Sequence, residues 1–285
     1  KSRRKLRITY KNKKNMSRAG KTYFITGGAS GLGLATAKKL HSEGANITIA
    51  DLNEKAGKAI EAEMGGRCLF QKVDVTNEEQ MAAAVAATVE KFGTLNGCVN
   101  SAGLGAAATT VTRDGKPMSN KTWDFVMKIN AYGTFYGSAH CAAAMSKLAP
   151  DEEGNRGCIV NVSSIAGIEG QKGQLVYSAS KGAVIGMTLP MARDLARFGI
   201  RVMTICPGIM DTPLMMGAPD RVRDPLLKGV VSPKRFGKPN EFAMLVTSII
   251  DNNYLNGEVI THNKRLLGSS INFKCKSVGA TETLI

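Results

Sequence analysis

Tyr177 and Lys181 stand four residues apart in the segment QLVYSASKGAV. If this segment is helical, both side chains leave the same face, and the lysine ammonium group can lie beside the phenol. Such a pair is suited to proton transfer, because a nearby cation stabilises the phenolate form of a tyrosine. Lowering a tyrosine pKa from about 10 to about 7 takes about 4 kcal/mol of preferential phenolate stabilisation. Taken alone, the spacing fits equally well a buried tyrosine beside a lysine that faces solvent.

A glycine-rich turn supplies a second chemical signal. The segment TGGASGLG, residues 26–33, follows a β-rich apolar run and opens into a helical pattern. Glycines let the backbone approach a pyrophosphate, whose negative charge is favoured by the free N–H groups and the dipole of a helix N-terminus. The dinucleotide contacts expected here are Gly27, Ser30, Gly31, Leu32 and Gly33.

Asp51 ends the next β-rich run, twenty residues after Gly31. A dinucleotide fold places an acid at this position to bind the adenosine ribose. The carboxylate would accept hydrogen bonds from the ribose hydroxyls and repel a 2′-phosphate, and neither Ser30 nor Leu52 offers a compensating positive charge. The prediction is therefore NAD rather than NADP. The alternative is an exposed aspartate in an ordinary turn.

Two further strand ends carry polar or small residues. Asp74 and Val75 end the third β-rich run, where the aspartate would bind the adenine amino group or only cap a helix. The segment VNSAG ends the fourth run. Its residues Asn100, Ala102 and Gly103 would let the backbone pass close to a ribose, or would simply form a turn.

These residues must be positioned by the alternation of short β-rich runs and longer helical patterns that starts at Lys21. The β-rich runs lie at residues 22–27, 46–51, 68–75, 97–103, 158–164, 201–208 and 257–260. Continuous apolar strands separated by helices indicate a parallel sheet covered on both faces. Because no linker divides the chain body and no repeat is present, we expect one α/β domain with a doubly wound parallel sheet.

The net charge of +15 lies mainly in the two ends of the chain. Residues 1–15 hold eight Lys or Arg and no acid, and residues 261–285 hold four Lys or Arg and one Glu, leaving +4 for residues 16–260. Short basic end segments are usually solvated. We therefore expect 1–15 to be a basic tail, disordered or non-native, 16–260 to be the folded domain, and 261–285 to be an atypical tail of uncertain structure.

Membrane and metal functions are not expected. No apolar run approaches the roughly 20 residues that a membrane helix needs. The cysteines lack a C-x-x-C pair or zinc-site spacing, so they are expected to be reduced thiols inside a cell, without a metal. They are Cys68, Cys98, Cys141, Cys158, Cys206 and Cys275.

Taken together, the motifs TGGASGLG, NSAG, VMKINAYGTF, YSASK and PGIMDT resemble the short-chain dehydrogenase/reductase family over roughly residues 20–260. The resemblance implies a Rossmann-like, three-layer α/β/α domain. It also implies a catalytic tetrad of Asn130, Ser164, Tyr177 and Lys181, with Ser164 preferred over Ser163 because it stands thirteen residues before Tyr177. The further cofactor contacts that it implies are Tyr177, Lys181, Pro207, Gly208 and Thr212.

The resemblance also assigns roles. Tyr177 would take the hydroxyl proton of a secondary alcohol while hydride leaves to the nicotinamide, its pKa lowered by Lys181 and by the positive nicotinamide. Ser164 would orient the substrate oxygen, and Asn130 would hold a water in a proton relay with Lys181. Thr212 matches the position that holds the nicotinamide carboxamide.

Within the family, the chain closely resembles the type II 3-hydroxyacyl-CoA dehydrogenases, also called 17β-hydroxysteroid dehydrogenase type 10. This implies NAD-linked interconversion of (3S)-3-hydroxyacyl-CoA and 3-oxoacyl-CoA, with possible hydroxysteroid activity. It also implies a homotetramer or homodimer in the mitochondrial matrix or the cytoplasm. The branch carries an extra loop, matched here by residues 104–123, and the chain departs from the pattern by lacking an Asp-Gly turn after Ile260.

Two alternatives stay open. A 3-oxoacyl-carrier-protein reductase shares the tetrad, but it normally uses NADPH, against which Asp51 argues. An RNA-binding or tRNA-maturation scaffold would use the basic tails for phosphate contacts, although aromatic platform motifs for RNA are absent.

The substrate cleft should be flanked by residues 104–123 and 213–237, because both segments follow strand ends. In the second segment, Leu214, Met215 and Met216 are candidates to cover an acyl chain. The basic residues Arg221, Arg223 and Lys228 would meet CoA phosphates, or would simply face solvent from a helical lid.

Overall fold

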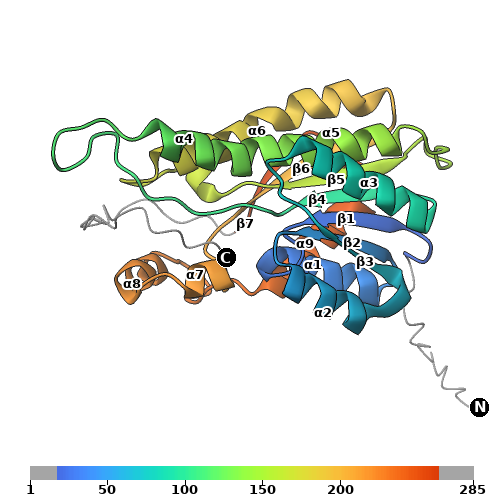
Figure 1. Ribbon diagram of the computed structural model, residues 1–285, viewed down its shortest axis with the longest axis horizontal. Coiled ribbons are helices and arrows are strands. Elements are labelled where there is room, and N and C mark those ends of the chain that lie inside the picture. The colour runs from blue at the N-terminus through green and yellow to red at the C-terminus, as the bar shows by residue number, and fades with distance from the viewer. Residues whose placement is uncertain (1–17, 263–285) are drawn as a thin grey trace, which may run out of the picture.

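The computed structural model describes residues 18–262, and Figure 1 shows a central sheet with helices on both faces. The predicted tail 1–15 lies outside the described residues, as does 261–285 apart from its first two residues. Within the described range, no helix is both long and apolar enough to cross a membrane. The same range contains no cluster of three or more His, Cys, Asp or Glu side chains suited to a metal ion.

The described residues form one seven-stranded sheet in the order β3-β2-β1-β4-β5-β6-β7, with every neighbouring pair parallel. The strands are β1 (Thr22–Thr26), β2 (Asn46–Asp51), β3 (Cys68–Lys72), β4 (Gly97–Asn100), β5 (Gly157–Val162), β6 (Ile200–Pro207) and β7 (Val259–His262). The strand order reverses between β1 and β4, which is where doubly wound sheets open a ligand crevice. The predicted α/β fold is confirmed.

Helices cover the sheet in two layers (Figure 1). One layer contains α1 (Gly31–Ser42), α2 (Glu54–Met64) and α9 (Pro239–Asp251), and the other contains α3 (Glu78–Phe92), α4 (Asn120–Met127), α5 (Gly133–Met145) and α6 (Leu175–Ala196). Short elements are η1 (Gly65–Arg67), the π-helical turn η2 (Lys128–Tyr132), η3 (Ile165–Gly167), α7 (Pro213–Met216) and α8 (Asp220–Lys228). The last two helices lie beyond the sheet, on the side of the loop that follows β4.

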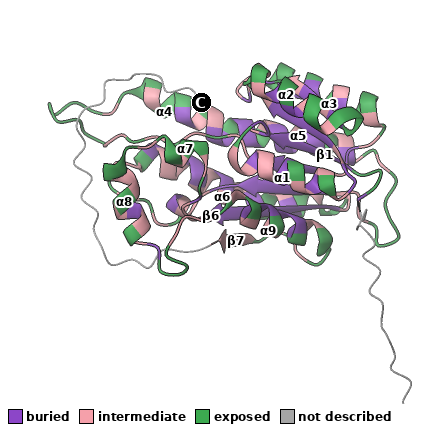
Figure 2. Cartoon of the chain, turned by 90° about the horizontal axis from the view of Figure 1, so that it is seen from below, coloured by how far each residue is buried: buried purple, intermediate pink, exposed green. Residues whose placement is uncertain are grey.

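The two faces of the sheet have separate hydrophobic cores, because successive strand residues point to opposite faces. Phe24 belongs to the core beneath α3, α5 and α6, whereas its neighbour Ile25 belongs to the core beneath α1, α2 and α9. Both side chains are fully buried. Figure 2 shows the strands as a buried layer between helices whose outer faces are exposed.

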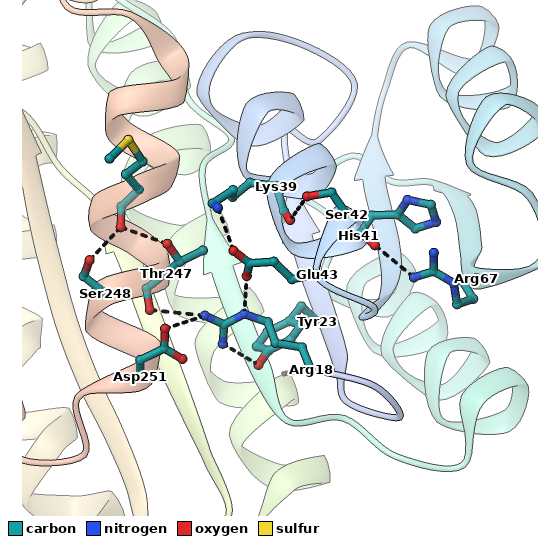
Figure 3. Close-up of polar contacts among 11 residues, drawn as sticks. Arg18, Tyr23, Lys39, His41, Ser42, Glu43, Arg67, Thr247, Ser248 and Asp251 are labelled. Carbon is teal, nitrogen blue, oxygen red and sulfur yellow. Dashed lines mark hydrogen bonds and ion pairs between the residues drawn. The ribbon is translucent and has the colours of Figure 1, made fainter. Parts of the chain in front are cut away.

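A buried arginine ties the beginning of the described chain to two helices (Figure 3). Arg18 Nε donates to Glu43 Oε2 at 2.6 Å, and its Nη2 donates to Asp251 Oδ2 at 2.8 Å. Lys39 approaches the other oxygen of Glu43 at 2.7 Å. These cations hold the pKa of Glu43 below its usual value despite the burial of its carboxyl group. The cluster therefore joins the turn before β1 to the end of α1 and to α9.

Several element boundaries differ from the sequence expectation; the fourth strand, for example, ends at Asn100 rather than Gly103. Strand β3 ends at Lys72, because Asp74 Oδ1 accepts hydrogen bonds from Thr76 N and Oγ1 and closes a turn. The loop expected at 104–123 ends at residue 119, because α4 begins at Asn120. The final strand forms and extends two residues beyond Ile260, since β7 pairs with β6 as far as His262.

Candidate active site

The predicted site residues gather at one edge of the sheet, where the carboxyl ends of the parallel strands meet. Thr26, Asp51, Asn100, Val162 and Pro207 are the last residues of five of these strands. Figure 1 places the loop after β4 and helices α7 and α8 at this same end. The topology therefore brings together residues that are far apart in the sequence.

The turn between β1 and α1 forms a close-packed glycine cradle. Gly27 has φ +65°, and a Cβ atom there would lie 2.8 Å from the backbone of Ala102. A Cβ atom on Gly33 would lie 2.2 Å from the carbonyl oxygen of Gly27. Ser30 is exposed and makes no side-chain cap bond at the N-terminus of α1. The cradle leaves backbone room for a pyrophosphate, as the motif predicts.

Asp51 turns its carboxylate toward this cradle. Oδ2 accepts a hydrogen bond from Ala29 N at 3.0 Å, and Oδ1 accepts one from Asn53 N at 2.9 Å. Leu52 beside it is 53% exposed, so its side chain is available to a ligand. The two backbone donors fix the orientation of the carboxylate at the edge of the crevice, where a ribose would meet a negative charge.

The two residues predicted at the end of the third strand, Asp74 and Val75, contact other residues of the protein. Asp74 is half-buried, and its Oδ1 serves the turn with Thr76. Val75 is buried, and a Cβ atom on Gly133 would lie 2.8 Å from Val75 Cγ2. The two residues therefore form a wall where the β3 side of the crevice meets the start of α5.

Asn100 uses its side chain inside the protein. Nδ2 donates to Ser138 Oγ at 2.9 Å and to Asn161 Oδ1 at 2.8 Å, and the side chain is buried. A Cβ atom on Gly137 would lie 2.1 Å from Asn100 Oδ1. Any contact of Asn100 with a cofactor must therefore use its backbone, while its amide joins the ends of β4 and β5 to α5.

Lys181 is buried beneath the crevice. Its Nζ donates to the carbonyl oxygen of Val162 at 3.0 Å, and the residue is 5% exposed. A Cβ atom on Gly103 would lie 3.2 Å from this Nζ, which places the ammonium group against the NSAG turn. Burial disfavours the charged form and lowers the pKa of Lys181 to about 8.

Tyr177 lies on the first turns of α6 and forms a side-chain hydrogen bond with Ser164. Burial raises the pKa of the phenol, and the bond with Ser164 opposes this rise only in part. Desolvation is the physical cause, because it disfavours the phenolate. The lowered pKa expected from the sequence also requires the positive nicotinamide, so it stays a prediction for the protein with its cofactor bound.

The two adjacent serines have different surroundings. Ser163 is buried, and its Oγ donates to the backbone oxygen of Lys181 at 2.8 Å. Ser164 is half-buried, accepts a hydrogen bond from Ala166 N at 3.1 Å and contacts Tyr177. The geometry therefore favours Ser164 as the serine that faces a substrate.

Asn130 lies in the π-helical turn η2 and holds the beginning of the loop after β4. Its Oδ1 accepts from Leu104 N at 2.9 Å, and its Nδ2 donates to Leu104 O at 3.0 Å. Nδ2 also donates to Ser180 Oγ at 3.0 Å. Ser180 was not singled out from the sequence, although it lies within the YSASK motif. The Asn130 side chain thus joins η2, the loop and α6.

The segment after β6 folds back over the glycine cradle. Gly208 N donates to His262 O at 2.8 Å, which fixes the turn after Pro207 against β7. Thr212 caps α7 by accepting from Met215 N at 3.4 Å. A Cβ atom on Gly31 would lie 3.5 Å from Thr212 Cγ2. Gly31 and Thr212, two predicted cofactor contacts that are far apart in the sequence, are therefore neighbours in space.

A pocket of about 590 Å³ lies between the loop after β4 and the segment that leads into α6. Ala108 N donates to Gly173 O at 2.7 Å and joins the two walls. The lining residues are Ala108, Thr109, Thr110, Val111, Gly170, Gln171, Lys172, Gly173, Leu175 and Ser178. Residues 108–111 of the predicted cleft-flanking loop line this pocket, whereas none of residues 213–237 does.

The α7–α8 segment contributes apolar and basic side chains. Leu214 is 55% exposed and Met216 is 36% exposed. Arg223 forms an ion pair with Asp220 and donates to Met216 O at 3.2 Å, so it is engaged within its own segment. Arg221 and Lys228 are exposed and remain the candidates for phosphate contacts among the three predicted residues.

Comparisons with known proteins agree with this geometry. The family model described as short chain dehydrogenase matches residues 21–222. The chain is 47% identical to a 3-hydroxyacyl-CoA dehydrogenase type-2 from Bos taurus, over 85% of this chain and 93% of that protein. It is 46% identical to the protein of the same name from Homo sapiens, over 83% of this chain and 91% of that protein. A crystal structure of 3-hydroxyacyl-CoA dehydrogenase type-2 from Mycobacterium avium superimposes with a TM-score of 0.80 at 39% identity, covering 85% of this chain and 94% of that one.

Proposed function

The chain belongs to the short-chain dehydrogenase family, and we propose that it interconverts (3S)-3-hydroxyacyl-CoA and 3-oxoacyl-CoA with NAD as cofactor. The observation that carries the reaction class is the hydrogen bond between Tyr177 and Ser164, with the buried Lys181 one helical turn further along α6. The proposed substrate rests on the relatives named 3-hydroxyacyl-CoA dehydrogenase type-2.

In the proposed mechanism, a bound nicotinamide supplies the hydride acceptor. Ser164 donates a hydrogen bond to the substrate oxygen and orients it toward Tyr177. The Tyr177 oxygen takes the hydroxyl proton, and in the reverse direction it returns that proton to the carbonyl oxygen. Lys181 lies one helical turn from Tyr177 and adds the positive charge that favours the phenolate. Asn130 positions the loop that closes this side of the cleft.

The chain's own residues fit a dinucleotide. Gly27 and Gly33 leave room that a Cβ atom would fill, so the backbone can approach the pyrophosphate. Asp51 would accept hydrogen bonds from the adenosine ribose and repel a 2′-phosphate. This charge supports NAD as the cofactor and disfavours the NADPH-linked carrier-protein reductase as the alternative.

The substrate side combines apolar and basic surfaces. Leu214 and Met216 are exposed on α7 and would cover an acyl chain, while Arg221 and Lys228 on α8 would attract CoA phosphates. An apolar cleft of this kind would also admit a hydroxysteroid as a secondary substrate. The mitochondrial matrix or the cytoplasm is the compartment proposed from the sequence.

A homo-oligomer, a dimer or a tetramer, is part of the proposal. The neighbouring elements α4, η2 and α5 expose large aromatic side chains, and exposed apolar groups of this size are typical of surfaces that partners cover. They are Trp123, Phe125, Tyr132 and Phe135. A non-enzymatic alternative is an RNA-binding scaffold that uses the basic tails for phosphate contacts. Nearly all residues of these tails lie outside the described range 18–262.

A substrate panel tests the proposed function. Initial rates are measured for 3-hydroxybutyryl-CoA, the carrier-protein thioester and an uncharged secondary alcohol, each with NAD and with NADP. We expect the highest kcat/KM with the CoA ester and NAD, and a steeper loss of activity with added salt for that ester than for the uncharged alcohol. Identical salt profiles would contradict the phosphate contacts, and preference for NADP with the carrier-protein ester would favour the reductase.

A further inference from the structure

Ser180 lies on α6 between the two residues to which the proposed mechanism gives proton transfer. It stands three residues after Tyr177 and one before Lys181, and residues three or four apart lie on the same side of a helix. The Ser180 side chain is fully buried. The proposed mechanism does not use this hydroxyl, although it lies on the side of α6 that Tyr177 occupies.

The Ser180 hydroxyl is hydrogen-bonded as a donor and as an acceptor. Its Oγ donates to the carbonyl oxygen of Tyr177 at 2.7 Å and accepts from Asn130 Nδ2 at 3.0 Å. The first bond lies within the helical turn that joins Tyr177 to Lys181, and the second leaves α6 and reaches η2. A buried polar network whose members are paired in this way is rigid, so the hydroxyl fixes its two partners relative to each other.

Asn130 continues this connection to the loop after β4. Its side-chain amide forms two hydrogen bonds with the backbone of Leu104, at 2.9 Å and 3.0 Å. Its backbone oxygen accepts from Thr134 Oγ1 at 2.8 Å, so α5 holds Asn130 as well. A Cβ atom on Gly103 would lie 3.0 Å from Asn130 Oδ1 and 3.2 Å from Lys181 Nζ. The amide and the ammonium group therefore pack against the same turn.

The same loop contacts the beginning of α6 at a second point. Ala108 N donates to Gly173 O at 2.7 Å, and Ala108 pairs with Gln174 in a parallel bridge. The loop is thus attached directly before the helix and, through Asn130, at Ser180. These two attachments lie on either side of Tyr177 in the sequence, so the position of the loop and the position of the Tyr177 turn depend on each other.

We propose that Ser180 is a positioning residue, which fixes the Tyr177–Lys181 turn of α6 to the loop after β4 through Asn130. This role rests on the proposed function, which assigns proton transfer to Tyr177 and Lys181, and adds the residue that holds their turn in place. Ser180 touches no reacting atom. It acts on kcat, because a small displacement of the phenol oxygen slows proton transfer even where substrate binding is retained.

Three substitutions separate the hydroxyl of Ser180 from its volume. Ser180→Ala removes the hydroxyl, Ser180→Cys keeps a side chain of similar size with a weaker hydrogen-bonding group, and Ser180→Thr keeps the hydroxyl. Thr188→Val is the matched control. Thr188 is also buried on α6 and donates to the preceding turn, at 3.1 Å from Val184 O, but it lies about 12 Å further along the helix.

The kinetic constants are measured with NAD and 3-hydroxybutyryl-CoA, or with whichever alcohol of the substrate panel the wild type oxidises. We expect kcat to fall about tenfold in Ser180→Ala and Ser180→Cys, as the loss of partners for a buried donor would give. Ser180→Thr should recover most of the lost kcat. KM should stay within about twofold of the wild type in all three variants, because the interaction acts on the transition state.

The pH profile of kcat distinguishes positioning from a general loss of stability. Its acidic limb reports the ionisation of Tyr177 in the enzyme–substrate complex. In Ser180→Ala this limb should move to higher pH, because the charge of Lys181 is then held less closely to the phenol. Thr188→Val should lower the free energy of unfolding but leave kcat and the pH profile as in the wild type.

Hydrogen exchange gives a measurement that does not depend on activity. Amide exchange in residues 104–119 should become several-fold faster in Ser180→Ala, because Asn130, which holds Leu104, loses its bond to α6. The same segment should exchange at the wild-type rate in Thr188→Val.

The outcomes separate the positioning role from the proposed function. Wild-type kcat with an unchanged pH profile in Ser180→Ala would overturn the role of Ser180 and leave the proposed function standing. Recovery by Ser180→Cys but not by Ser180→Thr, or an equal loss of kcat in Thr188→Val, would also overturn it, because volume or stability would then explain the effect. Oxidation of other alcohols but not of the CoA ester would contradict only the proposed substrate. No turnover of any alcohol would contradict the proposed function, and the role of Ser180 together with it.

Discussion

The Lys181 Nζ donates a hydrogen bond of 3.0 Å to the carbonyl oxygen of Val162, the last residue of β5. This contact joins α6 to the strand end that immediately precedes Ser163 and Ser164. It also keeps a positive charge in a buried position, where the protonated form of the lysine is disfavoured. The same burial that places Lys181 under the crevice therefore carries a cost in stability.

Lys181→Met should increase stability at pH 7 in the protein without cofactor. The folded-state pKa of about 8 lies below the ordinary value of 10.5, so below pH 8 the lysine is charged in both states and the burial cost is complete. Between pH 8 and 10.5 the folded state releases its proton first, and wild-type stability rises by up to about 3 kcal/mol. Urea unfolding across this range should show the advantage of the variant shrinking as pH increases. A difference that does not change with pH would contradict the buried charge.

Tyr177→Phe should reduce turnover by a factor of about 10² to 10⁴, because it removes the proposed proton acceptor. The ring remains, so the dissociation constant for NAD should stay within about tenfold of the wild type, since the phenol oxygen contributes at most one hydrogen bond to the cofactor. Single-turnover rates and calorimetric titration with NAD measure the two effects. Tyr254→Phe is the matched control, because Tyr254 is 99% exposed. Comparable turnover in both variants would exclude Tyr177 as the base.

Asp51→Ser should lower kcat/KM for NAD and reduce the preference over NADP by about tenfold or more, because charged hydrogen bonds contribute about 1.5–3 kcal/mol. The variant removes both the ribose acceptor and the negative charge that repels a 2′-phosphate. Asp194→Ser, an exposed aspartate on α6, controls for the change in net charge. A wild-type enzyme that already prefers NADP would contradict the role of Asp51.

Arg18→Met should lower the free energy of unfolding by about 3 kcal/mol, because it leaves a largely buried Glu43 with one cation fewer. The folded-state pKa of Glu43 lies below its ordinary 4.5, so its stabilising contribution is present above pH 4.5 and is lost as pH falls through the folded value. The difference between wild type and variant should therefore shrink in acid.

Two controls accompany this measurement. Lys38→Met removes an exposed ion pair with Glu63 and should change stability by less than about 1 kcal/mol. Removal of residues 1–15 retains Arg18 and should leave both folding and NAD-linked activity nearly unchanged, as the charge and composition of that segment predict. Loss of soluble protein after this truncation would show that the segment is structural.

Local patterns predicted the elements of the fold and its family, both of which are confirmed. A four-residue spacing places Tyr177 and Lys181 on one face of α6 because an α-helix has 3.6 residues per turn. Apolar runs followed by glycine or aspartate predicted the strands, although β3 and β4 each end three residues before the expected position. The roles of these site residues remain predictions that the variants above test.

Tertiary structure alone decided how the polar side chains are used. Asn100 turns inward to Ser138 and Asn161, Asn130 is occupied by Leu104 and Ser180, and Arg18 reaches Asp251 across the chain. Burial likewise raises the pKa of Tyr177 in the protein without cofactor. Local spacing determines which face of an element a residue occupies. The partner that satisfies a buried polar group comes from a distant segment, and only packing brings that segment within hydrogen-bond distance.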